Sequence, residues 1–135
     1  KNAGYNLKDM INQDIKDTSK KNLYNIEVED ENIDFRRVIN QDTFFYRYAK
    51  ILDTDIYNVG EFMPGDILVF DNGDHIAMTS DKYNANGVPY LIQNRDETQK
   101  QKEEDRLEKT DMKVTDHYRF EYNNKIKDLI NKIKE

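Results

Sequence analysis

The clearest pattern of apolar and polar positions lies between residues 63 and 94, where two turn signals separate three apolar runs. The first run, residues 67–70 (ILVF), is short and continuous, as expected of a strand that is buried on both faces. Asn72-Gly73 favours a tight hairpin turn after it, because both central residues of a type I′ turn need positive φ. Asn86-Gly87 gives a second turn before the third run. We therefore expect three antiparallel strands, with His75 at the start of the second.

Three amphipathic helices are predicted outside this block. Asn6 is placed to cap the first helix, and Asn40 or Asp42 the second, because short polar side chains accept hydrogen bonds from the free N–H groups of a first turn. Asn123 or Asn124 is placed to cap the last helix. The apolar positions that recur at helical spacing are Leu7, Met10, Ile11 and Ile15; Phe44, Phe45, Tyr48, Ala49 and Leu52; and Ile126, Leu129, Ile130 and Ile133.

The remaining segments complete an α+β fold class. Residues 112–122 return to strand-like alternation and predict a fourth strand, with Met112, Val114, Asp116, Tyr118 and Phe120 on one parity. Residues 17–37 predict a long irregular connection, and the highly charged residues 97–109 predict a solvated loop or an exposed helical turn. The sum is an antiparallel sheet of about four strands packed against N-terminal helices, with a C-terminal helix at the end.

Composition narrows the classes of partner. The 135 residues suffice for one domain with a substantial core. Twenty-one basic and 27 acidic side chains are interleaved along the chain and give a net charge of −6, which argues against nucleic acid as a partner, because phosphate binding needs clustered Lys and Arg. No membrane span is predicted, since no stretch approaches ~20 apolar residues, and no signal peptide is present in the chain. Without cysteine there are no disulfides and no thiolate metal sites.

Several kinds of chemistry are excluded by the motifs. Neither Ser19 nor Ser80 lies in a G-x-S-x-G elbow, and the five glycines form neither a phosphate loop nor a dinucleotide fingerprint. The two histidines are too far apart for an H-E-x-x-H zinc site. Asp71, Asp74 and Asp81 suggest calcium, but the remaining ligands of a calcium loop are missing and a hairpin turn already explains the segment. We therefore predict no cofactor-binding and no metal-binding residue.

His75 is the candidate catalytic residue. A histidine at the start of a strand is often an inert, hydrogen-bonded side chain, and that interpretation stays open. Two features favour a general base instead: His75 follows a tight turn that holds its backbone, and Gln93 and Asn94 end the next strand as polar amides. A general-base histidine needs such a group to fix its tautomer and ring angle. The pair would be half of a catalytic triad, and the nucleophile would come from elsewhere.

At these positions the sequence resembles the NlpC-type, papain-like cysteine peptidase and amidase superfamily. The similar segments of its core are residues 64–67 (PGDI), 75–78 (HIAM) and 80–82 (SDK). A closer resemblance is to an uncharacterised bacterial branch, domain of unknown function 1287, which also shows segments similar to residues 3–5 (AGY), 33–38 (IDFRRV), 92–94 (IQN) and 117–119 (HYR). The resemblance covers residues 1 to about 121, and the order of its short motifs along the chain makes it fairly specific.

The resemblance implies a papain-like fold with a cysteine nucleophile on a helix, a histidine on the second strand and a polar residue on the third. The histidine corresponds to His75 and the third residue to Gln93, where the family often has histidine, with Asn94 as second choice. The family's cysteine belongs to a helix that ends just before residues 3–5. Residues 1–5 (KNAGY) also suggest a helix end on capping grounds, so the cysteine is expected upstream of Lys1 and this chain is expected to be inactive alone.

Three functional hypotheses follow. The first is a cysteine hydrolase of amide bonds over residues 1–122, acting on peptides of the bacterial cell wall (peptidoglycan) outside the cytoplasm, with residues 123–135 as a C-terminal amphipathic helix. The second is a non-catalytic module that holds a peptide or glycopeptide in the same cleft. The third is a structural domain in which His75 is only a packed residue. His117 is predicted to pack in the structure or to line the cleft.

Overall fold

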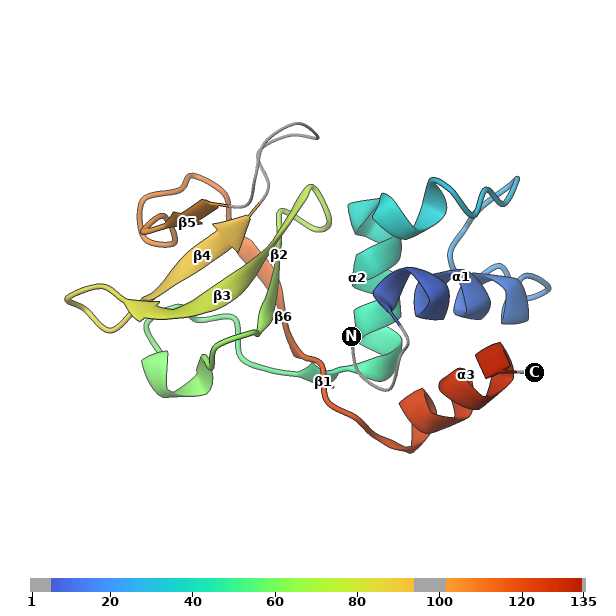
Figure 1. The fold of residues 1–135 in the computed structure, drawn as a ribbon. Helices are drawn as coiled ribbons and strands as arrows, with labels where there is room; N and C mark the ends of the chain where they lie inside the picture. Colours follow the sequence, from blue (N-terminus) through green and yellow to red (C-terminus); the bar gives the residue numbers. More distant parts are fainter. Residues whose placement is uncertain (1–5, 94–101, 135) are drawn as a thin grey trace. The chain divides into compact units, whose positions relative to one another are not determined.

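The computed structural model describes residues 6–93 and 102–134, and these residues fall into two compact units (Figure 1). The helical unit comprises the described residues up to Ala49 together with those from Glu121 onward. The sheet unit comprises the described residues between Lys50 and Phe120. Each unit has its own buried apolar residues. Within the described ranges, none of the helices has the length and apolar character needed to cross a membrane.

The helical unit contains three α-helices and a short 3-10 helix: α1 (Leu7–Asp17), η1 (Asp34–Arg36), α2 (Val38–Tyr48) and α3 (Asn124–Lys134). The prediction for the first helix is confirmed, because Asn6 Oδ1 accepts a hydrogen bond from the N–H of Asp9 at 2.9 Å. The last helix is capped in the same way by Asn123, whose Oδ1 accepts from the N–H of Ile126. The buried apolar side chains of this unit are Met10, Ile11, Ile15, Tyr24, Phe44, Phe45, Ile126, Leu129 and Ile130.

The predicted bounds of the second helix are wrong at both ends. It begins at Val38 with no side-chain cap from Arg37, and Asn40 is buried inside it, donating to the carbonyl of Asp34 at 2.9 Å. It ends at Tyr48, because Ala49 has the extended backbone of the strand that follows. Leu52 therefore lies outside the helix, and its N–H donates to the carbonyl of His117 at 2.8 Å. Pairing with a strand has overridden the helical spacing here.

Asp14 is the polar centre of the helical unit. Its side chain is buried, and one of its oxygens accepts hydrogen bonds from the hydroxyl of Tyr24 at 2.6 Å and from Nε of Arg47 at 2.7 Å. The other accepts from the hydroxyl of Tyr48 at 2.7 Å and from Nη2 of Arg47 at 2.9 Å. Burial alone would raise the pKa of Asp14, but these hydrogen bonds outweigh it and lower the pKa below its ordinary value.

The sheet unit is built on six antiparallel strands, not the predicted four or so. They are β1 (Lys50–Ile51), β2 (Ile67–Phe70), β3 (His75–Tyr83), β4 (Pro89–Gln93), β5 (Lys102–Glu104) and β6 (Val114–Arg119), with the 3-10 helix η2 (Val59–Glu61) before β2. Their order across the sheet is β1-β6-β2-β3-β4-β5. The two strands missed by the prediction, β1 and β5, are the short edge strands. Both lack the apolar alternation that predicts a strand, and β5 occupies part of the predicted loop.

The two predicted hairpins are present, but both turns are centred one residue earlier than predicted. In the second, the N–H of Gly87 donates to the carbonyl of Asn84, so Ala85 and Asn86 are central. The first turn is shifted in the same way. Asp71 and Asn72 are its central residues, with φ values of 50° and 59°, and the N–H of Gly73 donates to the carbonyl of Phe70. Both φ values have the sign that a type I′ turn requires. The turn makes Phe70 and His75 direct partners at the end of the β2–β3 ladder.

A register shift in β6 corrects the predicted parity of that strand. Phe70 pairs with Val114, but Val69, the residue before Phe70, pairs with Asp116. Thr115 is therefore the extra residue of a bulge in β6. Val114 therefore faces the same side as Phe70, whereas Asp116 and Tyr118 face the other side. The bulge also brings His117 opposite Leu68, on the side where the core of this unit lies.

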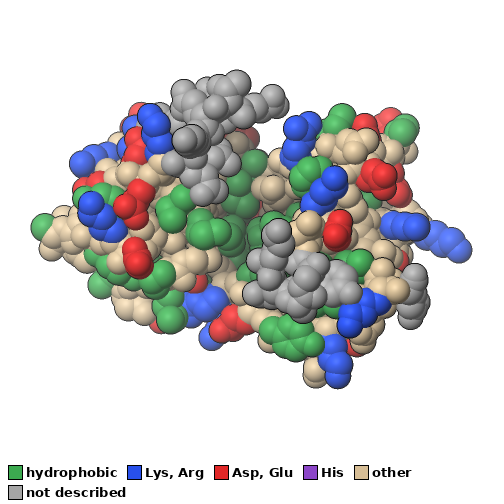
Figure 2. All heavy atoms as spheres, in the orientation of Figure 1, with side chains coloured by type: hydrophobic (Ala, Val, Ile, Leu, Met, Phe, Trp, Pro, Cys, Tyr) green, Lys and Arg blue, Asp and Glu red, His purple; other side chains and the backbone are tan. Residues whose placement is uncertain are grey.

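One face of the sheet is covered by the unit's own loops. The buried apolar cluster on this face consists of Phe62, Leu68, Phe70, Ala77, Val88, Leu91, Leu107 and Val114. Leu107 belongs to the segment between β5 and β6, and Phe62 follows η2, so both connections are anchored to the sheet. On the surface visible in Figure 2, basic and acidic side chains of the described residues are interspersed over both units, and no broad area of one charge is seen.

Candidate functional site

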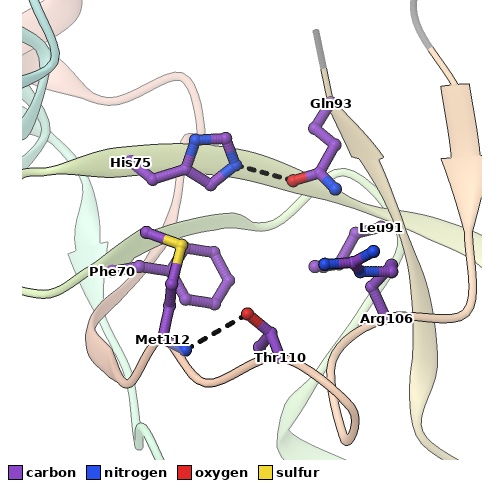
Figure 3. A pocket seen from close by; sticks show the side chains of 7 residues that line it. All are labelled: Phe70, His75, Leu91, Gln93, Arg106, Thr110 and Met112. Carbon is purple, nitrogen blue, oxygen red and sulfur yellow. Dashed lines mark hydrogen bonds between the residues drawn. The ribbon is translucent and has the colours of Figure 1, made fainter. Parts of the chain in front are cut away.

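His75 and Gln93 meet on neighbouring strands of the sheet unit. The β3–β4 ladder pairs Thr79 with Leu91, and since side chains alternate with a period of two, His75 and Gln93 point to the same face as diagonal neighbours. His75 Nε2 lies 2.6 Å from Gln93 Oε1, as drawn in Figure 3. The structure thus brings together two of the three residues predicted from the sequence. Asn94, the alternative orienter, lies outside the described residues.

Glu104 fixes the orientation of the Gln93 amide. Gln93 Nε2 donates to Glu104 Oε1 at 3.4 Å from the neighbouring strand β5. A carboxylate only accepts hydrogen bonds, so it selects the NH₂ side of the amide and leaves Oε1 facing His75. An amide oxygen also only accepts, so His75 Nε2 carries the proton of this contact. In the neutral ring, Nδ1 of His75 is then the nitrogen that is free to take up a proton.

A pocket of about 210 Å³ opens beside this pair in the sheet unit. Figure 3 shows His75 and Gln93 along the top of the view and Phe70 and Leu91 below them, and these two apolar side chains are buried. The seven lining residues are Phe70, His75, Leu91, Gln93, Arg106, Thr110 and Met112. The ring of Phe70 lies 5.7 Å from that of His75, centroid to centroid, in a tilted arrangement. Half-buried His75 therefore stands between an apolar floor and solvent, the position that a general base needs.

The chemical capacity of the site is proton transfer, without a nucleophile of its own. The 135 residues contain no cysteine. In residues 6–93 and 102–134, no group of three or more His, Cys, Asp or Glu side chains is placed to hold a metal ion. The catalytic roles of His75 and Gln93 stay predictions. Glu104 was missed because its charged surroundings predict a loop, and no pattern in the sequence links it to Gln93.

Asp66 belongs to a second cluster of polar side chains, in the same unit but buried. Asp66 Oδ2 lies 2.6 Å from Nε2 of His117, and Arg119 donates to both carboxylate oxygens at 2.8 Å. His117 Nδ1 lies 2.6 Å from the carbonyl oxygen of Asp53, and the ring stacks on Phe62 with centroids 4.3 Å apart. Both polar partners of the ring are oxygen atoms that accept hydrogen bonds, a carbonyl oxygen on one side and a carboxylate oxygen on the other.

This cluster is structural. Burial alone would raise the pKa of Asp66, but hydrogen bonds from Arg119, the N–H of Met63 and His117 outweigh it and lower the pKa. The backbone N–H of Asp66 also donates to Oγ1 of Thr79 on β3. His117 has no exposed surface, so no substrate reaches it. Of the two predicted alternatives for His117, packing holds and lining of a cleft does not.

Comparison with known proteins places the chain in a family. A model described as Domain of unknown function (DUF1287) matches residues 1–120. The uncharacterised protein YijF of Escherichia coli strain K12 is 41% identical over 68 residues, which make up 48% of this chain and 33% of YijF. The chain thus matches about a third of the length of that curated relative, and no solved structure matches it significantly. Since the family model covers most of its length, the chain belongs to the DUF1287 family.

Proposed function

We propose that this domain is the base-bearing part of a cysteine hydrolase of the papain-like, NlpC-type superfamily. It acts on amide bonds in peptides, and cell-wall (peptidoglycan) peptides outside the cytoplasm are the expected substrates. The observation that carries the proposal is the hydrogen bond between His75 Nε2 and Gln93 Oε1 at the rim of the pocket. The resemblance of residues 64–67 and 75–78 to the core of that superfamily adds the reaction class.

The proposed mechanism uses Nδ1 of His75 as the proton carrier. A cysteine supplied by a part of the protein outside these 135 residues gives its thiol proton to Nδ1, and the thiolate attacks the amide carbonyl carbon. The imidazolium then gives that proton to the nitrogen of the leaving amine as the C–N bond breaks and a thioester remains. Water hydrolyses the thioester, with Nδ1 accepting a proton from water and returning it to the thiol.

Gln93 acts as the positioning residue in this mechanism. Its oxygen holds Nε2–H, so Nδ1 stays free, and it stabilises the positive ring that forms when the thiol ionises. Glu104 prevents the amide from turning its NH₂ group toward the ring. Both strands that carry the pair, β3 and β4, are held in the ladder of the sheet, which fixes the ring before a substrate arrives.

The test is amide hydrolysis by the whole gene product that contains this chain. Peptides released from purified peptidoglycan are incubated with the parent protein and with His75→Ala, and new amino groups are quantified. We expect the substitution to abolish cleavage, and iodoacetamide to inactivate the parent. Asp74→Ala, at the exposed neighbouring position in the same turn, is the matched control and should cleave normally. Equal activity of parent and His75→Ala would reject the assignment.

A non-catalytic binding module is the second candidate function. The observation that favours it is the absence of cysteine from all 135 residues. In that case the gene product binds a cell-wall peptide in calorimetry and leaves it intact over long incubation. Binding would then depend on the pocket beside His75, and His75→Ala would weaken it without any change in covalent chemistry.

A further inference from the structure

The pocket beside His75 combines an apolar floor with a positive charge. Phe70, Leu91 and Met112 supply carbon surface, and Arg106 is the one permanently charged side chain among the seven lining residues. No carboxylate is among these seven residues, although acidic residues outnumber basic ones in the chain by 27 to 21. Figure 3 places Arg106 beside Leu91, across the pocket from Phe70 and Met112. A positive charge beside carbon surface suits a ligand that combines an anionic group with an apolar one.

The backbone of Arg106 is held firmly. Its carbonyl accepts hydrogen bonds from the N–H groups of Lys109 and Thr110, both at 2.9 Å. The next residue, Leu107, is buried in the apolar cluster of the sheet unit. The guanidinium itself makes no hydrogen bond or ion pair with any residue of the described ranges. No described residue therefore competes with a ligand for its five donors, and the backbone that presents them does not have to move.

The size of the pocket limits what enters it. At about 210 Å³ it is smaller than the roughly 300–1,000 Å³ of pockets that enclose a complete small-molecule ligand. It fits a residue-sized group, with carbon atoms against Phe70 and Leu91. A guanidinium pairs best with a carboxylate, through two parallel N–H···O bonds. The Thr110 hydroxyl faces Met112, whose N–H donates to Oγ1 at 3.2 Å (Figure 3).

We propose that this pocket is a specificity site for a carboxylate attached to an apolar group, on the substrate residue next to the amide bond that faces His75. Arg106 binds the carboxylate, and Phe70, Leu91 and Met112 contact the carbon part. The inference rests on the proposed function and narrows it, from amide bonds in peptides generally to those beside a residue with a free carboxylate. Arg106 is exposed, so a carboxylate can reach it from solvent, whereas an uncharged residue in the same place would gain no ion pair with it.

A binding experiment tests the inference independently of catalysis. N-acetyl-leucine, which combines a carboxylate with an isobutyl group, and the neutral N-acetyl-leucinamide are titrated into the gene product. The ring signals of His75 are followed by NMR, with those of buried His117 as internal reference. We expect the acid to bind about threefold to fivefold more tightly than the amide. Arg106→Gln should remove that preference, whereas Lys113→Gln, a loss of the same charge at an exposed position outside the pocket, should keep it.

The outcomes separate this inference from the proposed function. Equal binding of acid and amide by the parent, or a preference that survives Arg106→Gln, overturns the carboxylate site. A second measurement compares cleavage of two peptides that differ only by Glu or Gln beside the scissile bond. Cleavage of both peptides at equal rates also overturns the carboxylate site, but it supports the proposed hydrolase activity. If the acid binds more tightly than the amide but neither peptide is cleaved, the carboxylate site is supported and the proposed hydrolase function is rejected.

Discussion

Asp66 and His117 face each other across β2 and β6 with 2.6 Å between Oδ2 and Nε2, and their side chains are 1% and 0% exposed. Asp66 comes directly before β2, and His117 lies in the middle of β6, fifty-one positions further along the chain. Arg119 closes the cluster from the same strand as His117. The pair therefore helps to fix how β2 and β6 are aligned. Because β2 also pairs with β3, the same alignment supports the hairpin that carries His75.

Replacing Asp66 by asparagine should unfold the sheet unit at lower denaturant concentration. The amide of the variant would keep the shape of the side chain but leave Arg119 without its counter-charge and His117 without its carboxylate partner. Loss of one partner of a buried ion pair costs about 3 kcal/mol of unfolding free energy. Urea titration followed by circular dichroism measures this cost, and Asp111→Asn, at an exposed position, is the control that should stay within about 0.5 kcal/mol of the parent. Identical midpoints for Asp66→Asn and the parent would contradict the structural role.

Acid should destabilise the protein through Asp14 and Asp66. Burial opposes ionisation of both carboxyls, but their donors, Arg47 with two tyrosines and Arg119 with His117, prevail and lower both pKa values in the folded state. A folded-state pKa below the unfolded value of about 3.9 gives stability that is fully present above that pH. The stability is lost as the pH falls through the lower folded-state values.

Urea unfolding between pH 7 and pH 2 measures this dependence. We expect a nearly constant unfolding free energy down to about pH 5 and a steep fall below about pH 4. Asp66→Asn removes one of the two carboxyls, so its fall should be shallower from a lower starting value. The same steepness in parent and variant would show that Asp66 does not take part.

The helical spacing and the turns were predictable because their causes are local. Asn6 and Asn123 each precede an amphipathic stretch, and each caps the helix that follows. The period-two pattern and two turn signals likewise placed His75 on the strand next to Gln93 and Asn94, but they did not decide which of the two amides His75 meets. Glu104 could not be found in this way, because β5 is a charged edge strand whose pairing depends on β4 and not on its own sequence.

The buried polar cluster was missed for a different reason. Asp66 follows Pro64-Gly65, a turn signal that accounts for the segment locally, and nothing in the sequence indicates partners more than fifty positions away. No sequence pattern predicts the bulge at Thr115 either. The bulge nevertheless determines that His117, and not Asp116, lies on the same face as Leu68. Long-range pairing thus sets both features, and a one-residue slip would exchange the two side chains.

Gly65 should tolerate alanine less well than Gly60 does. Gly65 has a φ of +87°, while Gly60 has no such positive φ, and a Cβ at either position meets no atom within 4 Å. Because a Cβ has room at both positions, the two variants differ only in backbone conformation. An L-residue in the left-handed region costs roughly 1–2 kcal/mol of folding free energy. Gly65→Ala should therefore lower the unfolding free energy by about 1 kcal/mol, and Gly60→Ala should leave it unchanged or raise it slightly. Thermal and urea unfolding compare the two variants directly. Equal destabilisation by both would point to contacts instead of backbone strain.

Gln93→Leu should lower the turnover number of the proposed hydrolase. Leucine has a similar size but no acceptor, so Nε2 of His75 loses its partner and both ring tautomers become accessible. A hydrogen bond to a group that becomes charged is worth about 1.5–3 kcal/mol, which corresponds to roughly a tenfold to hundredfold fall in kcat. Gln93→His restores a polar partner of the kind that the resembling superfamily often has, and should recover much of the lost rate. Steady-state kinetics separates the effect on kcat from the effect on KM. If Gln93→Leu kept the kcat of the parent, the 2.6 Å contact would be a feature of the fold and not of catalysis.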